Sequence, residues 1–118
     1  MKIGNLFHGI PARLPQELSE RIAGEAGVRI ERIVSRAHAS PEGFWYDQEE
    51  DEWVLLVSGS AGVAFEGRDE LVVLGAGDHL TIPAHCKHRV EWTDASSDTV
   101  WLAVFYPSAA STAGAPGD

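Results

Sequence analysis

A regular series of short β-type segments separated by turn residues is the feature that most constrains the fold of this sequence. Turn clusters such as Pro41-Glu42-Gly43 and Ser58-Gly59-Ser60 recur about every 8 to 12 residues. No segment between them reads as a strand–helix–strand crossover, so a parallel sheet is not expected. The pattern predicts an all-β protein, an antiparallel sandwich or barrel. The expected strands cover residues 28–34, 44–46, 52–57, 61–66, 70–74, 79–82, 88–92 and 99–106.

The two ends of the sequence differ from this pattern. Residues 1–14 mix apolar residues with Gly and Pro and are expected to form an arm. A short N-terminal helix is predicted next, because Pro15 fits a first helical turn and Leu18 and Ile22 lie four residues apart. The expected organisation is an arm and short helix over 1–27, a β-barrel over 28–106, and a loose tail rich in Ala, Ser, Gly and Pro over 107–118.

Length and charge limit the classes of function. A chain of 118 residues is expected to form one domain around one core. With a net charge of −9, the protein lacks the basic surface that is typical of nucleic-acid binding. The same charge would repel it from anionic lipid. No apolar run approaches the ~18 residues of a membrane span, and the first residues lack the apolar stretch of a signal peptide. We therefore expect a cytoplasmic protein whose partner is a small molecule, a metal or a second copy in a symmetric homodimer.

An acidic run precedes the most apolar of the predicted strands. Five of the six residues from 47 to 52 are Asp or Glu. Such a run is typical of a solvated loop. Glu52 differs from the others because it opens the apolar strand 52–57, where its side chain can point into the barrel. A carboxylate in that position needs a cation, a hydrogen-bond donor or a raised pKa.

Two histidines lie just after the bend that Pro83 predicts. His85 and His88 are separated by two residues. Neutral imidazole is a good ligand for divalent transition metals, and two histidines with one carboxylate on a rigid sheet can form an open three-ligand site. His38, at the end of the first predicted strand, is a further candidate for the same interior. The alternative is that one histidine packs against Trp92 while the other lies on the surface.

Two spaced motifs in the sequence resemble those of the cupin superfamily. Glu52 is followed after six residues by Gly59, as in the first cupin motif. The segment 77–88 matches the Gly, Pro and His spacing of the second motif, with His85 at a glycine position. The chain is similar to the small members of this superfamily that contain a single cupin domain. The resemblance covers about residues 28–106 and implies an antiparallel jelly-roll β-barrel.

The resemblance also implies a divalent metal, which typical members bind through a His-x-His pair, the glutamate and the histidine of the second motif. Only Glu52 and His88 carry over, because Tyr46 and Gln48 stand at the His-x-His positions. Trp92 stands where the second motif has an asparagine. Tyr46, Gln48 and Trp92 are therefore candidate substrate-binding residues.

Two functions remain open at this point. In the first, a variant site holds Fe, Mn, Ni or Zn, and Glu52 acts as a metal ligand or as a catalytic base. The candidate metal ligands are Glu52, His85, His88 and His38, with Gln48 as a substitute. The family resemblance offers dioxygenase or isomerase chemistry on a small molecule. In the second, the barrel is a non-catalytic module that binds or senses a small molecule without metal, among aromatic side chains at its mouth.

Overall fold

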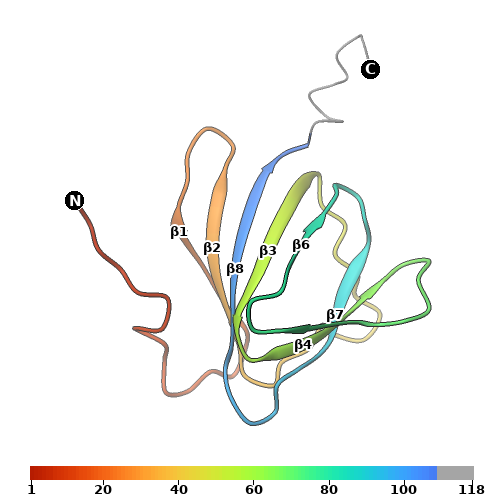
Figure 1. The fold of residues 1–118 in the computed structure, drawn as a ribbon, viewed down its shortest axis with the longest axis horizontal. Helices are drawn as coiled ribbons and strands as arrows, with labels where there is room; N and C mark the ends of the chain where they lie inside the picture. The colour runs from red at the N-terminus through yellow and green to blue at the C-terminus, as the bar shows by residue number, and fades with distance from the viewer. Residues whose placement is uncertain (109–118) are drawn as a thin grey trace.

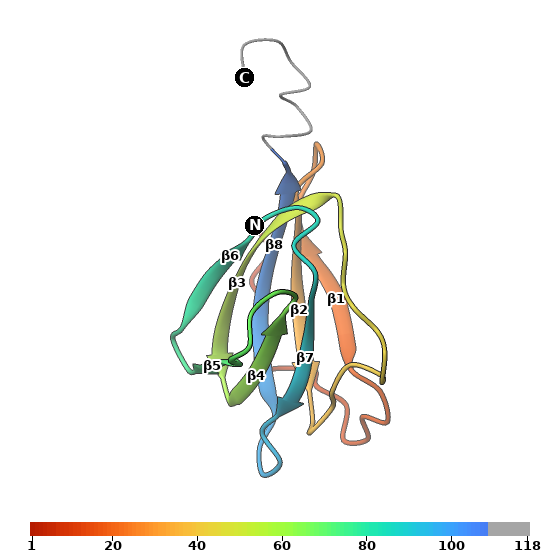
Figure 2. The ribbon, with the colours of Figure 1, turned by 90° about the vertical axis from the view of Figure 1, so that its right-hand side faces the viewer.

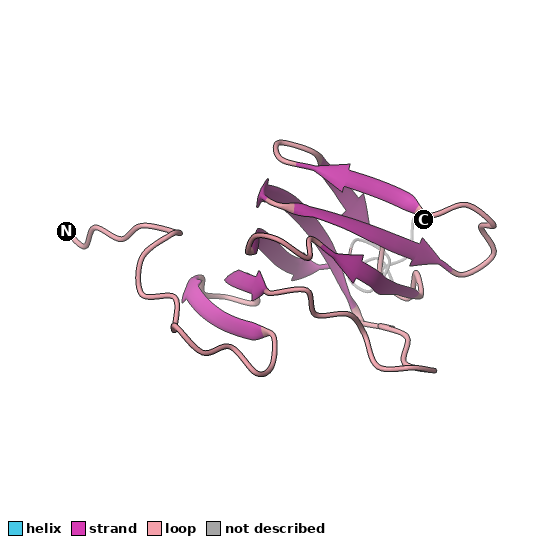
Figure 3. Ribbon diagram, turned by 90° about the horizontal axis from the view of Figure 1, so that it is seen from below, coloured by secondary structure: helices cyan, strands magenta, loops and turns pink. Residues whose placement is uncertain are grey.

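The computed structural model describes residues 1–108, which form eight β-strands and no helix (Figure 1, Figure 3). The predicted all-β class is therefore confirmed, whereas the tail expected over 107–118 lies outside the described residues except for its first two positions. The strands are β1 (Leu18–Ala23), β2 (Arg29–Ser35), β3 (Glu50–Ser58), β4 (Ser60–Phe65), β5 (Val72–Gly75), β6 (His79–Ile82), β7 (His88–Thr93) and β8 (Thr99–Pro107).

The strands form two antiparallel sheets that face each other. The larger sheet has the order β1-β2-β8-β3-β6, and the smaller has the order β5-β4-β7 (Figure 2). The last strand, β8, lies between β2 and β3, although it is far from both in sequence. This arrangement places β3 and β7, which contain Glu52 and His88, on opposite sheets.

Within residues 1–108 the two sheets do not close into a barrel with a continuous hydrogen-bonded ladder, which corrects the predicted closed barrel. The segment 36–49 instead runs along β7 and pairs with it at isolated points. The Ser40 amide donates to the Val90 carbonyl at 2.8 Å, and Tyr46 and His88 exchange backbone hydrogen bonds of 2.7 and 3.1 Å. A loop therefore covers the side of the sandwich that a further paired strand would close.

The predicted N-terminal helix over 15–23 is wrong. Residues Leu18–Ala23 form β1, which pairs with β2 in antiparallel register. Along β1, Leu18 and Glu20 are half-buried while Ser19 and Arg21 are exposed, a period of two rather than four. Glu20 also forms an ion pair with the buried guanidinium of Arg32 on β2. Pairing with the sheet edge therefore outweighs the weak local helical signal.

Alternation along two central strands determines what reaches the interior. On β3, Glu52, Val54 and Leu56 are buried, whereas the residues between them are half-buried. Their partners on β8 are Phe105, Ala103 and Trp101, which are buried on the same face. The core cluster between the sheets is Val54, Leu56, Ala61, Val63, Leu74, Ile82, Trp101, Ala103 and Phe105. Burying this apolar surface is the main source of stability for the sandwich.

Gly59 occupies the tight connection between β3 and β4. Its φ is +88°, in the left-handed region, and a Cβ atom added there would lie 2.4 Å from Oγ1 and 2.7 Å from Cα of Thr99. Only glycine fits this turn, because any side chain meets both backbone strain and a direct clash. The glycine that the first motif places after Glu52 therefore fixes the turn from the large sheet to the small one.

The arm over residues 1–14 leaves the body of the molecule beside β1 (Figure 1). Arg32 donates to the carbonyl oxygens of Leu6 and His8, and Arg36 donates to that of Ala12. These bonds hold the arm through its backbone rather than through its apolar side chains. Since residues 1–108 contain no helix, none of them forms a helical membrane span.

Candidate functional site

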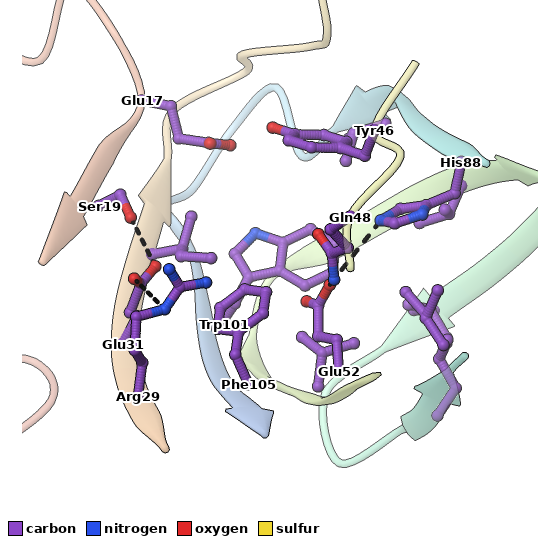
Figure 4. A pocket seen from close by; sticks show the side chains of 17 residues that line it. Glu17, Ser19, Arg29, Glu31, Tyr46, Gln48, Glu52, His88, Trp101 and Phe105 are labelled. Atoms are coloured by element: carbon purple, nitrogen blue, oxygen red, sulfur yellow. Dashed lines mark hydrogen bonds and ion pairs between the residues drawn. The ribbon is translucent and has the colours of Figure 1, made fainter. Parts of the chain in front are cut away.

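A cavity of about 320 Å³ lies between the two sheets. It combines an apolar floor with eight polar or charged side chains, a composition typical of small-molecule sites. Its exposed residues Glu17 and Ser19 mark the side that is open to solvent. The lining residues, shown in Figure 4, are Glu17, Ser19, Arg29, Glu31, Ile33, Tyr46, Gln48, Glu52, Val54, Val63, Leu74, Leu80, Ile82, His88, Val90, Trp101 and Phe105.

Glu52 lines the cavity, and its side chain points inward as the sequence predicted. Its position on the inward face of β3, opposite Phe105, buries the carboxyl. Burial raises the pKa of Glu52 to about 7, although the hydrogen bond from Gln48 Nε2 to Glu52 Oε1, at 3.0 Å, favours the ionised form. The desolvation cost is the larger effect because no Lys or Arg side chain within residues 1–108 forms an ion pair with the carboxyl. The side chain can therefore hold or release a proton near neutral pH.

His88 faces Glu52 from the other sheet. Its Nδ1 atom lies 2.8 Å from the carbonyl oxygen of Cys86, so Nδ1 is the protonated nitrogen and donates this hydrogen bond. The Nε2 atom lies 3.8 Å from Glu52 Oε1. Burial lowers the pKa of His88, which favours the neutral ring. Because 3.8 Å is too long for a hydrogen bond, the Nε2 lone pair is free to contact a molecule beside Glu52.

Tyr46 and Gln48 reach the cavity from the loop that precedes β3. The ring of Tyr46 stacks on the ring of His88, with 5.2 Å between centroids. Burial, together with the carboxyls of Glu17 and Glu52, raises the pKa of Tyr46, so its hydroxyl stays protonated and can donate. In Figure 4 this hydroxyl points toward Glu17. The structure thus places both predicted substrate-binding residues of this loop in the cavity wall.

A second polar wall was not found from the sequence. The hydroxyl of Ser19 donates to Glu31 Oε1 at 3.0 Å, and that of Ser35 donates to Glu17 Oε2 at 2.9 Å. Arg29 lies beside Glu31 on the same face of β2. Charged and apolar residues alternate only over 29–31, because Arg32 follows Glu31, so the pattern carried little signal that residues 29, 31 and 33 line the cavity.

Three predicted site residues lie outside the cavity lining. His85 has a side chain that is 63% exposed, a φ of +60°, and an Nδ1 atom 2.8 Å from Asp47. The Nδ1 atom of His38 accepts a hydrogen bond from the backbone amide of Arg36 at 2.9 Å. Trp92 is 37% exposed and covers Gly62, where an added Cβ atom would lie 2.2 Å from its Nε1 atom.

The donors present do not fit the four-ligand metal centre that the family resemblance implies. Within residues 1–108, no group of three or more His, Cys, Asp or Glu side chains is placed to hold a metal ion. Of the expected ligands, Glu52 and His88 converge, whereas His85 and His38 do not line the cavity. Gln48 uses its amide nitrogen to bond Glu52, and a nitrogen in that role is a donor rather than a metal ligand.

Several proteins of known structure share the architecture of this chain. A protein of Ralstonia eutropha JMP134 with the provisional name of mannose-6-phosphate isomerase is 50% identical, and the match covers 92% of this chain and 100% of that chain with a TM-score of 0.88. A cupin superfamily protein of Desulfitobacterium hafniense DCB-2 is 23% identical over 84% of each chain, with a TM-score of 0.67. A cupin of Methanocaldococcus jannaschii with a double-stranded β-helix fold is 15% identical, covers 88% of this chain and 92% of that chain, and has a TM-score of 0.65.

The family assignment follows from sequence as well as from structure. No curated protein matches the chain. The model of the Cupin domain matches residues 36–105, which is more than half of the chain and includes both spaced motifs. Together with the 50% identical relative, this match shows that the chain belongs to the cupin domain family.

Proposed function

We propose that this protein is an isomerase that moves a proton within a small organic molecule, with Glu52 as the acid–base group. The observation that carries the proposal is a buried carboxyl in the wall of a ligand-sized cavity, 3.8 Å from the free Nε2 atom of His88. The provisional name of the Ralstonia eutropha relative supports the reaction class. Proton transfer by a carboxyl with a pKa near the working pH is efficient, because both protonation states are populated.

The three polar groups around the centre suggest a division of roles. As a carboxylate, Glu52 takes a proton from the hydroxyl-bearing carbon next to a carbonyl group, and the resulting acid returns it to the former carbonyl carbon. The proton of that hydroxyl group passes through Nε2 of His88 to the former carbonyl oxygen, so that the step balances. The protonated hydroxyl of Tyr46 donates to the substrate oxygen as negative charge develops there. The Nε2 lone pair of His88 accepts a hydrogen bond from a substrate hydroxyl. Gln48 orients the carboxyl through its 3.0 Å hydrogen bond.

A non-catalytic binding barrel is the second candidate. The observation that favours it is the pairing of Gln48 with Glu52, which occupies one carboxyl oxygen. A glutamate held in this way can serve as a recognition group that accepts a hydrogen bond from a bound molecule. The two candidate functions predict the same ligand-binding residues, but only the isomerase is expected to convert its ligand into a product.

The test is proton exchange on hexoses, hexose 6-phosphates and amino hexoses, followed by NMR in D₂O with EDTA present. We expect the wild-type protein to exchange a carbon-bound proton of at least one compound and to interconvert its aldose and ketose forms. E52Q keeps the size of the side chain and is expected to lose about 100-fold or more of the rate. The matched control is E66Q, since the side chain of Glu66 is 62% exposed and does not line the cavity. Ligand binding without exchange, or an undiminished rate in E52Q, contradicts the proposal and favours the binding barrel.

A further inference from the structure

The charges that face the cavity are strongly unbalanced. Three carboxyl side chains line it, those of Glu17, Glu31 and Glu52. Among its lining residues, Arg29 is the one Lys or Arg side chain. His88 adds no positive charge while burial keeps its ring neutral. Arg29 offsets one carboxylate, and Glu52, with a pKa of about 7, is only partly ionised at neutral pH. The remaining charge of the lining is negative, which favours a cation over an anion.

Arg29 is not free to compensate an anionic ligand. Its Nη2 atom donates to Glu50 Oε1 at 2.8 Å, and its Nε atom lies 3.5 Å from Glu31 Oε2. Its guanidinium also lies over the ring of Phe105, 4.3 Å from the centroid. Two carboxylates lie within ion-pair distance of this cation, although its Nε atom has no hydrogen-bond partner. A phosphate group entering the cavity would therefore have to compete with Glu31 and Glu50 for Arg29.

The same wall shows what kind of group it accepts. The guanidinium of Arg29 lies between carboxylates and the aromatic face of Phe105. Carboxylates and aromatic faces also stabilise the positive charge of a bound organic cation. Glu17, at the open side, has a carboxyl held by the Ser35 hydroxyl rather than by a salt bridge. Although the residue is exposed, partial desolvation of its carboxyl by the surrounding protein raises the pKa of Glu17. The indole ring of Trp101 lies beside this wall (Figure 4).

We propose that the cavity takes a small organic cation, whose ammonium or similar group lies against Glu17 and Glu31 and whose body lies against Trp101. The proposal rests on the proposed function, because it names the substrate class of the same cavity. The reacting part of the molecule then extends toward Glu52 and His88. A phosphorylated sugar, the substrate class in the name of the Ralstonia eutropha relative, carries the opposite charge to the one this cavity favours.

The test uses probes that share one frame and differ in charge. Benzylammonium, benzyl alcohol and benzoate are titrated into the full chain with EDTA present, and mannose 6-phosphate is compared with mannose. The indole N–H of Trp101 is the NMR reporter, because it lies 3.4 Å from the Ser35 hydroxyl that bonds Glu17. We expect benzylammonium to bind about tenfold or more tightly than benzyl alcohol, and benzoate and mannose 6-phosphate to bind more weakly than their uncharged counterparts.

Variants locate the charge preference. E17Q and E31Q are each expected to reduce the preference for benzylammonium over benzyl alcohol by about threefold or more, whereas the exposed control E66Q leaves it unchanged. Thermal unfolding of each variant checks that the fold is intact, and E17Q is the milder change because Glu17 lies at the rim.

Each outcome separates the two proposals. Equal affinities for the three benzyl probes, tighter binding of benzoate or of mannose 6-phosphate, or no response to benzylammonium at ~10 mM overturns the cation proposal. In E52Q the preference for benzylammonium is expected to survive, because Glu17 and Glu31 remain, although proton exchange is lost. If the wild-type protein prefers benzylammonium but exchanges no carbon-bound proton, the proposed isomerase activity is refuted, whereas the proposal that the cavity binds an organic cation stands.

Discussion

Replacing Glu52 by Gln is expected to stabilise the folded protein above neutral pH. Burial raises the pKa of this carboxyl from 4.5 to about 7. The protonated form is compatible with the interior, so no stability is lost below the unfolded pKa. Between the unfolded and the folded pKa, the unfolded chain ionises while the buried carboxyl keeps its proton, so stability falls as the pH rises through this range. The gap between the two pKa values corresponds to about 3 kcal/mol of lost stability once the group is ionised in both states. Glutamine has nearly the same size and never ionises, so E52Q escapes this cost.

The assay is urea unfolding of wild type and E52Q between about pH 4 and pH 9. The difference in unfolding free energy is expected to be small near pH 4, to grow between pH 4.5 and 7, and to level off at about 3 kcal/mol in favour of E52Q. The charged groups that act on this carboxyl, Glu31, Arg29 and Glu50, are present in both proteins. E66Q should show no such trend. A difference that is independent of pH, or one that favours wild type increasingly as pH rises, refutes the assignment of a desolvated carboxyl.

Three further changes test other parts of the structure. G59A is expected to destabilise the fold by about 2–4 kcal/mol in urea unfolding, because the φ of +88° and the contact with Thr99 both oppose a side chain; an unchanged midpoint contradicts this turn geometry. Elemental analysis of protein purified without a tag or chelator is expected to find well below one transition metal per chain; about one ion per wild-type chain, lost in H88A, would instead establish a metal site. Light scattering is expected to give a homodimer, because Ile3 and Phe7 of the arm are 86% and 53% exposed; a monomer at all concentrations contradicts that interface.

The parts of the fold that the sequence predicted are those indicated by short apolar segments and turn residues. The strand that begins near Glu52 is a continuous apolar run over 53–57, typical of a buried strand, and its register with β8 turns the carboxyl inward as expected. Gly59 ends that strand where the spacing of the first motif places it. These features depend on neighbours in sequence, so a single sequence is enough to find them.

The N-terminal segment could not be predicted in the same way. The spacing of Leu18 and Ile22 fits both a helix and a strand, because residues four apart share a face in either. What decides is the pairing of β1 with β2 and the bond between Glu20 and the buried Arg32, a contact made across 12 positions. Propensity over a few residues is too weak to outweigh such pairing.

The candidate site was predicted in part for a similar reason. The family resemblance predicted that Glu52 and His88 share a site, and the structure brings them together from β3 and β7, which lie on opposite sheets. The direction of His85 depends on its φ of +60° and on its bond to Asp47, neither of which the spacing reveals. The wall of Glu17 and Glu31 arises only when β1 joins the sheet, so the mistaken helix also concealed it.

The most direct test of an acid–base centre is the titration of Glu52 itself. Carbon-13 NMR of the side-chain carboxyl in selectively labelled protein measures its pKa, and E52Q identifies the signal. We expect a midpoint at about 7, well above the 4.5 of an unperturbed glutamate. A midpoint near 4.5 would mean that Glu52 is solvated or paired with a cation at neutral pH, and would contradict both its burial between the sheets and its proposed role in proton transfer.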